Sequence, residues 1–131
     1  MITELRLEAN YLALRDLGAW LQSLVADCET NELGAIELGV HELATNCVDH
    51  AQPSDGVITF SGTVDGSLLR ITMCDRGIEF DAGKVTASHP DQPQVRGYGL
   101  MILEQLAHEL VYERQGDENI WRAAFPLYAA Q

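Results

Sequence analysis

The sequence predicts an α+β fold, a two-layer sandwich in which a mostly antiparallel sheet packs against about three helices. The spacing of hydrophobic residues along the chain predicts the elements in the order strand, helix, helix, two strands, long loop, helix, two strands. Both strand pairs flank short turn signals, Asp65-Gly66 and Gln115-Gly116-Asp117, which are typical of hairpins and exclude a doubly wound parallel sheet. The length of 131 residues is that of a single domain, which we expect to span residues 1–131.

The N-terminal half is expected to form one strand and two helices. Residues 2–8 alternate weakly between apolar and polar side chains, as in a strand. Over residues 10–28 apolar side chains recur three and four positions apart, which predicts one amphipathic helix. Thr30 and Asn31 are candidate N-caps of a second helix. This helix should end near Ala51, because the run that follows contains proline and glycine.

The C-terminal half is expected to form two hairpins separated by a loop and a helix. Residues 58–73 alternate on both sides of Asp-Gly, the first hairpin. Residues 76–96 are poor in apolar side chains and broken by glycine and proline, and a loop this long in a small domain is usually functional. Residues 100–110 repeat leucine at helical spacing, and residues 111–125 form the closing hairpin.

The charge of the chain limits its partners. Hydrophobic residues make up 47% and charged residues 21%, the balance of a globular protein, and the net charge is −12. Such a field repels phosphate backbones and anionic lipid, so we expect no direct nucleic acid and no membrane partner. The first residues lack signal-peptide character, which predicts a cytoplasmic protein. The three cysteines, Cys28, Cys47 and Cys74, are widely spaced and are expected to be reduced core residues.

A polar seam on the second predicted helix is the first candidate site. Glu42, Asn46 and His50 are four residues apart and therefore project near one line, beside the apolar stripe of the same helix. Two interpretations remain open, a solvated face or a carboxylate and an amide that meet a ligand or a hydrated Mg²⁺. A zinc-protease motif is excluded, because Thr45 stands where H-E-x-x-H needs its second histidine.

Two glycine-containing stretches are the other candidates. Asp75-Arg76-Gly77 follows a strand, and it is either a turn or an isolated carboxylate that accepts a hydrogen bond from an exocyclic amine such as adenine N6. Phe80 could supply an apolar wall beside it. Arg96-Gly97-Tyr98-Gly99-Leu100 opens the third predicted helix, where free backbone N–H groups favour an anion, although a lone G-x-G is often only a turn.

In this order and spacing, the three stretches resemble the motifs of the Bergerat nucleotide-binding fold of the GHKL ATPases. They are similar in particular to the small anti-sigma-factor serine/threonine kinases of bacterial partner-switching systems. Residues 42–51 match the N box, residues 75–81 the first glycine box and residues 97–101 the second. The segment of about residues 78–96 would then be the ATP lid.

The resemblance implies a role for each motif. Glu42 would be the general base, Asn46 would bind Mg²⁺ and Asp75 would bind adenine N6. The nucleotide site that the resemblance implies consists of Asn46, His50, Asp75, Gly77, Phe80, Arg96, Gly97, Gly99 and Leu100. The chain departs from the family pattern at Glu79, where many members have glycine, and at residues 120–124, which lack the usual threonine of the last strand.

The implied function is that of a switch. Such a protein binds ATP and Mg²⁺, phosphorylates a STAS-domain antagonist and sequesters a sigma factor or similar regulator, commonly as a homodimer. Two other functions remain open, a partner-switch module that binds ATP without transferring phosphate, and a detached histidine-kinase-like ATPase domain. Labelled product from ATP would distinguish the kinase from the module.

Overall fold

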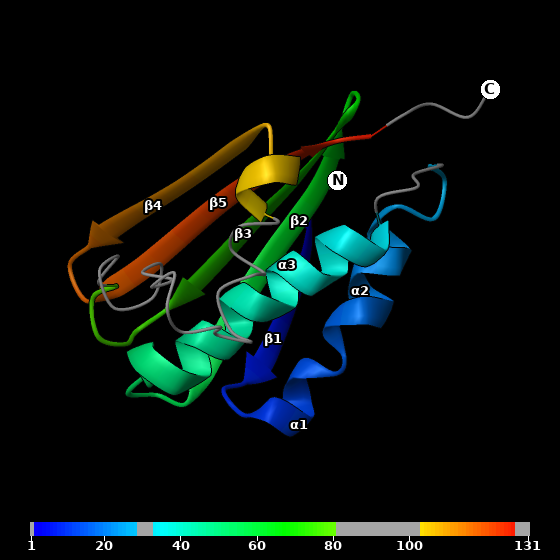
Figure 1. Ribbon diagram of the computed structural model, residues 1–131. Helices are drawn as coiled ribbons and strands as arrows, with labels where there is room; N and C mark the ends of the chain where they lie inside the picture. Colours follow the sequence, from blue (N-terminus) through cyan, green and yellow to red (C-terminus); the bar gives the residue numbers. More distant parts are fainter. Residues whose placement is uncertain (1, 29–32, 81–102, 128–131) are drawn as a thin grey trace, which may run out of the picture.

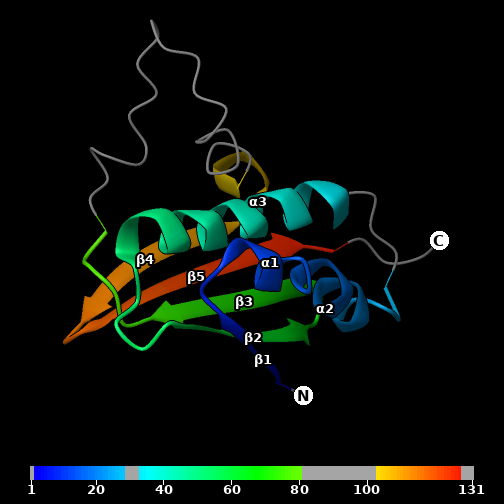
Figure 2. The ribbon, with the colours of Figure 1, turned by 90° about the horizontal axis from the view of Figure 1, so that it is seen from below.

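The computed structural model describes residues 2–28, 33–80 and 103–127 (Figure 1). In this part of the chain a five-stranded sheet carries the helices on one face (Figure 2). The predicted α+β sandwich is therefore confirmed. None of the helices described is long and apolar enough to cross a membrane.

The sheet has the order β1-β2-β3-β5-β4, and every neighbouring pair is antiparallel. Both predicted hairpins are present, and Gly66 takes the positive φ of 61° that the first turn requires. The central strand is β3, and in its pairing with β5 Asp75 lies opposite Asn119. This register places the C-terminal end of the first hairpin beside the start of β5, next to the turn of the second hairpin. The strands are β1 (Thr3–Glu8), β2 (Val57–Asp65), β3 (Leu68–Asp75), β4 (Glu109–Gln115) and β5 (Glu118–Pro126).

The single helix predicted over residues 10–28 is wrong, because the structure has two helices there. They are α1 (Tyr11–Leu14) and α2 (Leu17–Leu24). The Asn10 side chain caps α1 by accepting from the Ala13 amide at 2.9 Å. The Asp16 amide then bonds to the carbonyl of Ala13, three residues back instead of four. This tighter turn redirects the chain, so that Leu14 and Leu17 are both buried in the core.

The second predicted helix ends at Ala51 as expected, but its last turn is not α-helical. The structure has α3 (Leu33–Asn46) followed directly by a π-helical turn, η1 (Cys47–Ala51). Gln52 then takes a left-handed conformation and its amide bonds to the carbonyl of Cys47 at 2.9 Å, which ends the helix. The proposed caps Thr30 and Asn31 lie outside the described residues.

The third predicted helix is too long at its C-terminal end. Residues 103–106 are helical, whereas Leu110 belongs to β4. The His108 amide bonds to the carbonyl of Ala124 at 2.7 Å, and Glu109 pairs with the same residue of β5. Sheet pairing therefore overrides the helical spacing of the leucines.

The core lies between the helix layer and the sheet. Leu14 and Leu21 from the short helices, Ile36 from α3, and Phe60 and Phe125 from the sheet are almost fully buried in it. All three cysteines are free, which agrees with the prediction of reduced thiols. The core placement is confirmed for Cys47 alone, since Cys28 and Cys74 are half-buried.

Candidate nucleotide site

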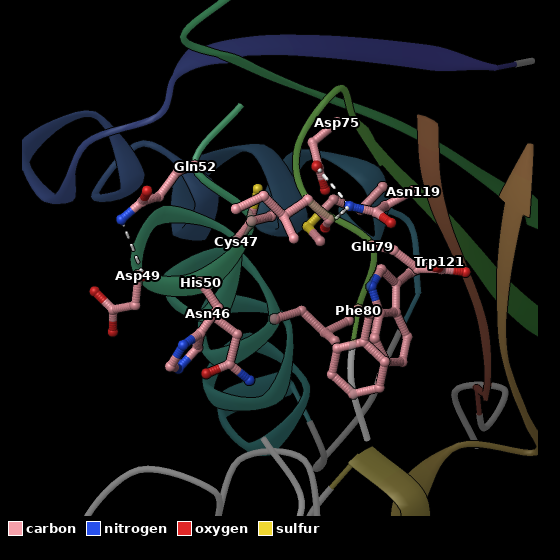
Figure 3. Close-up of a pocket in the computed structure, with 14 residues that line it drawn as sticks. Asn46, Cys47, Asp49, His50, Gln52, Asp75, Glu79, Phe80, Asn119 and Trp121 are labelled. Carbon is pink, nitrogen blue, oxygen red and sulfur yellow. Dashed lines mark hydrogen bonds between the residues drawn. The ribbon is translucent and has the colours of Figure 1, made fainter. Parts of the chain in front are cut away.

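A cavity of about 220 Å³ opens between the C-terminal end of the α3–η1 helix, the ends of β3 and β5, and residues 78–80 (Figure 3). Asn46 and His50 line it from the helix, and Asp75 and Asn119 from the two strands. Three segments that are far apart in the sequence therefore meet at one site. A cavity with apolar walls and a few convergent polar groups is the usual form of a small-molecule site.

Asp75 is the buried carboxylate of this cavity. The residue is 4% exposed, and Oδ1 accepts hydrogen bonds from the Gly77 amide at 2.9 Å and from Nδ2 of Asn119 at 3.0 Å. The Cys47 thiol lies close to this carboxylate. Burial first, and then the charge of Asp75, raise the pKa of the Cys47 thiol far above its ordinary value, so it stays neutral. A carboxylate held this way is a strong acceptor for a ligand amine.

The turn after Asp75 is pressed against the end of the π-helical turn. The Ile78 amide donates to the carbonyl of Ala51 at 2.7 Å, and the Ser54 hydroxyl donates to the carbonyl of Arg76 at 3.2 Å. A Cβ on Gly77 would lie 2.7 Å from the Cβ of Ala51 and closer still to its carbonyl oxygen. Gly77 is therefore needed because two backbones touch at this point.

An aromatic wall closes one side of the cavity. Phe80 packs edge-on against Trp121 with ring centroids 4.7 Å apart, and Tyr112 lies about equally close to both rings, at 5.1 and 5.0 Å. Phe80 and Trp121 line the cavity. Phe80 therefore supplies the apolar wall predicted from the sequence, together with Trp121. Flat apolar surfaces of this kind suit a planar base.

The polar seam of the helix is brought to the cavity in part. Asn46 is 9% exposed and its Nδ2 has no hydrogen-bond partner among the described residues, whereas His50 is exposed at the rim beside it (Figure 3). Asp49, next to His50, accepts a hydrogen bond from the Tyr11 hydroxyl of α1. Glu42 is half-buried one turn before Asn46 and is not among the described residues that line the cavity.

The sequence profile of a known family matches nearly the whole chain. The profile of the histidine kinase-like ATPase domain matches residues 4–125. The chain belongs to this family. An ATPase domain implies ATP as the ligand. No curated protein matches the chain significantly.

Solved structures share the fold of this ATPase domain. A structure of the RsbU and RsbW domains of Rv1364c from Mycobacterium tuberculosis aligns with a TM-score of 0.71 at 19% identity, over 97% of this chain and 32% of that chain. The histidine kinase domain of the blue-light activated kinase EL346 from Erythrobacter litoralis aligns at 0.57 and 24% identity, over 85% of this chain and 61% of that chain. The catalytic domain of histidine kinase ThkA aligns at 0.55 and 14% identity, over 96% of this chain and 95% of that chain.

The remaining predicted residues of the ATPase domain lie outside the described part of the chain. They are Arg96, Gly97, Gly99 and Leu100, together with residues 81–96 of the predicted lid. Of the residues predicted to bind nucleotide, the structure brings five to one place. Asn46, His50, Asp75 and Phe80 line the cavity, and Gly77 shapes the turn beside it.

Two residues that line the cavity, Asn119 and Trp121, were not predicted as site residues from the sequence. Both line the cavity from β5. The signal was the alternation of this strand, because residues 119, 121, 123 and 125 share one face and Phe125 is a core residue. Recognising it as a site signal also required the pairing of β5 with β3, which the sequence does not reveal.

A Gly77→Ala variant is expected to lower the free energy of unfolding by about 1–3 kcal/mol, because the new methyl group collides with the Ala51 backbone. The collision should also displace Asp75 and weaken ATP binding. Urea unfolding and an ATP titration measure the two effects. The matched control is Gly34→Ala on α3, where a Cβ meets nothing within 4 Å. Equal stability of the two variants would contradict the close packing of this turn.

Proposed function

We propose that this chain, as a single ATP-binding domain, is an ATP-dependent serine/threonine protein kinase of the anti-sigma-factor type. The observation that carries the proposal is the pair of buried polar side chains in one cavity, Asp75 at the sheet end and Asn46 on the helix. Asp75 suits the amine of a base, and Asn46 suits a metal-bound phosphate. The cavity between them has the polarity that a nucleotide requires.

The adenine base would lie in the cavity with its amine on Asp75. Trp121 and Phe80 supply the apolar surface for the ring, and the buried carboxylate supplies the polar acceptor. The family resemblance assigns the phosphates to Gly97, Gly99, Leu100 and Arg96, with His50 at the rim of the cavity. Arg96 would add positive charge in a chain with only 8 basic residues.

The residues present fit a magnesium ion bound with the triphosphate. The buried amide of Asn46 has an Nδ2 without a partner among the described residues, so burial of this group calls for a ligand acceptor such as a phosphate oxygen. Its amide oxygen is a hard ligand of the kind that Mg²⁺ prefers. A bound Mg²⁺ would supply charge neutralisation on the transferring phosphate.

We assign the general base to Glu42. This side chain is half-buried on α3, one helical turn before Asn46, and can take the proton of an incoming serine or threonine hydroxyl. The acceptor would be a STAS-domain antagonist, and a phosphate on it would break its interface with the kinase through charge and desolvation.

The second proposed partner is a sigma factor or a similar regulator. With a net charge of −12, the protein would attract a basic surface and accelerate association with it. The fold similarity to a protein that contains RsbU and RsbW domains supports a partner-switching context. We propose a homodimer in the cytoplasm as the working form.

The experiment is incubation of the protein with Mg²⁺, γ-labelled ATP and a STAS-domain protein encoded beside its gene. Label on a serine or threonine of the STAS protein is the expected result. Tight ATP binding without label would favour the non-catalytic module, which one observation supports, since Glu42 does not line the described cavity. Label on a histidine would favour a histidine-kinase-like domain.

Replacing Asn46 with alanine is expected to weaken binding of MgATP about tenfold or more, because the amide is lost as both ligand and donor. The loss should be smaller for ATP in the presence of EDTA, where only the donor matters. Calorimetry with and without the metal measures both affinities. An equal loss under the two conditions would contradict the assignment of Mg²⁺ to Asn46.

A further inference from the structure

Asn119 has the most fully bonded side chain at the site. It is 1% exposed on β5, directly across from Asp75. Its Nδ2 donates to Oδ1 of Asp75 at 3.0 Å and to the carbonyl of Ile78 at 2.8 Å. Its Oδ1 accepts from the Tyr112 hydroxyl at 2.5 Å and from Nη1 of Arg114 at 3.1 Å. The two bonds of Nδ2 join the β4–β5 hairpin to the segment that carries Asp75, and the two bonds of Oδ1 lie within the hairpin.

These four bonds use the whole capacity of the amide, which has two N–H donors and two lone pairs on oxygen. Tyr112 and Arg114 both donate hydrogen bonds toward Asn119, so the acceptor oxygen of the amide, and not its NH₂ group, must face them. The nitrogen end must then face Asp75. The orientation of the amide is thus determined by the neighbouring residues of β4.

The same residues of β4 also hold the backbone of the turn. Nη1 of Arg114 donates to the carbonyl of Gly77 at 2.6 Å, and the Tyr112 hydroxyl accepts from the Phe80 amide at 2.9 Å. The segment that follows Asp75 is therefore held by β4 on one side and by the π-helical turn on the other. Both N–H donors, from Gly77 and from Asn119, bind Oδ1 of the carboxylate, and Oδ2 takes no part in these two bonds.

We propose that Asn119 is a positioning residue for base recognition, which orients the carboxylate of Asp75 so that the site prefers a purine with a 6-amino group. By occupying Oδ1, Asn119 leaves the other oxygen to accept from the base. A carboxylate that is already oriented loses less freedom when the ligand binds, so the bond to the amine contributes more affinity. The inference rests on the proposed nucleotide site.

The test compares ATP with purine riboside triphosphate, which differs from ATP only in lacking the 6-amino group. A hydrogen bond to a charged acceptor predicts that the wild-type protein prefers ATP by roughly tenfold to a hundredfold. In an Asn119→Asp variant the donor becomes a second carboxylate facing Asp75, and adjacent carboxylates do not both stay ionised without moving apart. The preference should fall below about threefold, with the affinity for purine riboside triphosphate nearly unchanged.

An Asn119→Ala variant removes the same donor without adding charge and should lose the same preference. Asn10→Asp is the matched control, because aspartate also caps α1 and the residue is exposed outside the cavity. The ratio of the two affinities separates positioning from general damage, which weakens both ligands equally. Purine riboside triphosphate added during purification stabilises the folded variants by mass action.

Retention of the wild-type preference in either Asn119 variant would overturn the inference, and so would an equal loss of affinity for both nucleotides. Failure of both variants to fold would also overturn it, because Asn119 would then serve the sheet and not the base. A wild-type protein that binds both nucleotides equally would overturn the proposed contact between Asp75 and the amine. Failure of the positioning role is therefore seen in the Asn119 variants, and failure of the proposed nucleotide site is seen in the wild-type protein.

Discussion

An Asp75→Asn variant is expected to bind MgATP about a hundredfold more weakly than the wild-type protein. The carboxylate is the only charged acceptor that the described part of the cavity offers at its buried end, next to Asn119. An asparagine at position 75 has one acceptor oxygen and one NH₂ group. Its NH₂ group would face the donors of Gly77 and Asn119 or the amine of the base, so at least one donor would lack an acceptor. Loss of a charge-assisted bond together with an unpaired buried donor is worth about 3 kcal/mol. Calorimetric titration measures the loss.

Asp65→Asn is the control for this change. Asp65 is the last residue of β2, its side chain is 72% exposed, and it forms an ion pair with Arg70. The same chemical substitution there should leave the affinity for MgATP unchanged. If the two variants bind MgATP equally well, Asp75 does not contact the nucleotide, and the base must lie elsewhere.

A Glu42→Gln variant is expected to transfer phosphate to the STAS-domain acceptor about 10²–10⁴-fold more slowly, which is the contribution of a general base. Binding of MgATP should be nearly unchanged, because Glu42 does not line the cavity. Single-turnover transfer from labelled ATP measures the rate, and calorimetry measures the affinity. A lower transfer rate at unchanged affinity for MgATP identifies a general base, whereas loss of affinity identifies a binding residue.

Glu37→Gln on the same helix is the matched control. Glu37 accepts a hydrogen bond from Gln22 of α2 at 3.3 Å and belongs to the contact between two helices. This variant should transfer phosphate at the wild-type rate. Transfer by Glu42→Gln that is as fast as transfer by Glu37→Gln would show that another group takes the proton, or that none is needed.

The fold could be predicted wherever local signals and pairing agree. The alternation of residues 58–73 around Asp65-Gly66 gave β2 and β3 because the turn and the pattern point to one hairpin. The end of the long helix at Ala51 followed from the glycine and proline beyond it. Both are short-range features, which a sequence contains in full.

The differences arise where contacts distant in sequence decide the structure. The periodicity of residues 10–28 continues through the break between α1 and α2, because both pieces bury leucine on the same side. Leu110 fits a helical spacing, yet its position in β4 is settled by pairing with Ala123 of β5. Helical spacing also does not reveal that residues 47–51 form a π-helical turn.

The candidate site was predictable from its motifs but not from its second strand. Asp75 and Asn46 stand out as polar residues beside apolar runs, and the structure brings both to one cavity. The alternation of β5 places Asn119 on the core face, but an asparagine after a turn usually belongs to the turn, so the residue does not stand out as part of a site. Its importance comes from lying across the sheet from Asp75, which depends on the strand order.

The central claim is that the cavity between the helix end and the sheet binds the adenine of ATP through Asp75. Titration calorimetry of the wild-type chain with MgATP, repeated with purine riboside triphosphate, tests it most directly. The expected result is saturable heat at one nucleotide per chain, with clearly tighter binding of ATP. Absence of heat with either nucleotide at high protein concentration, or equal affinity for the two, would contradict the account.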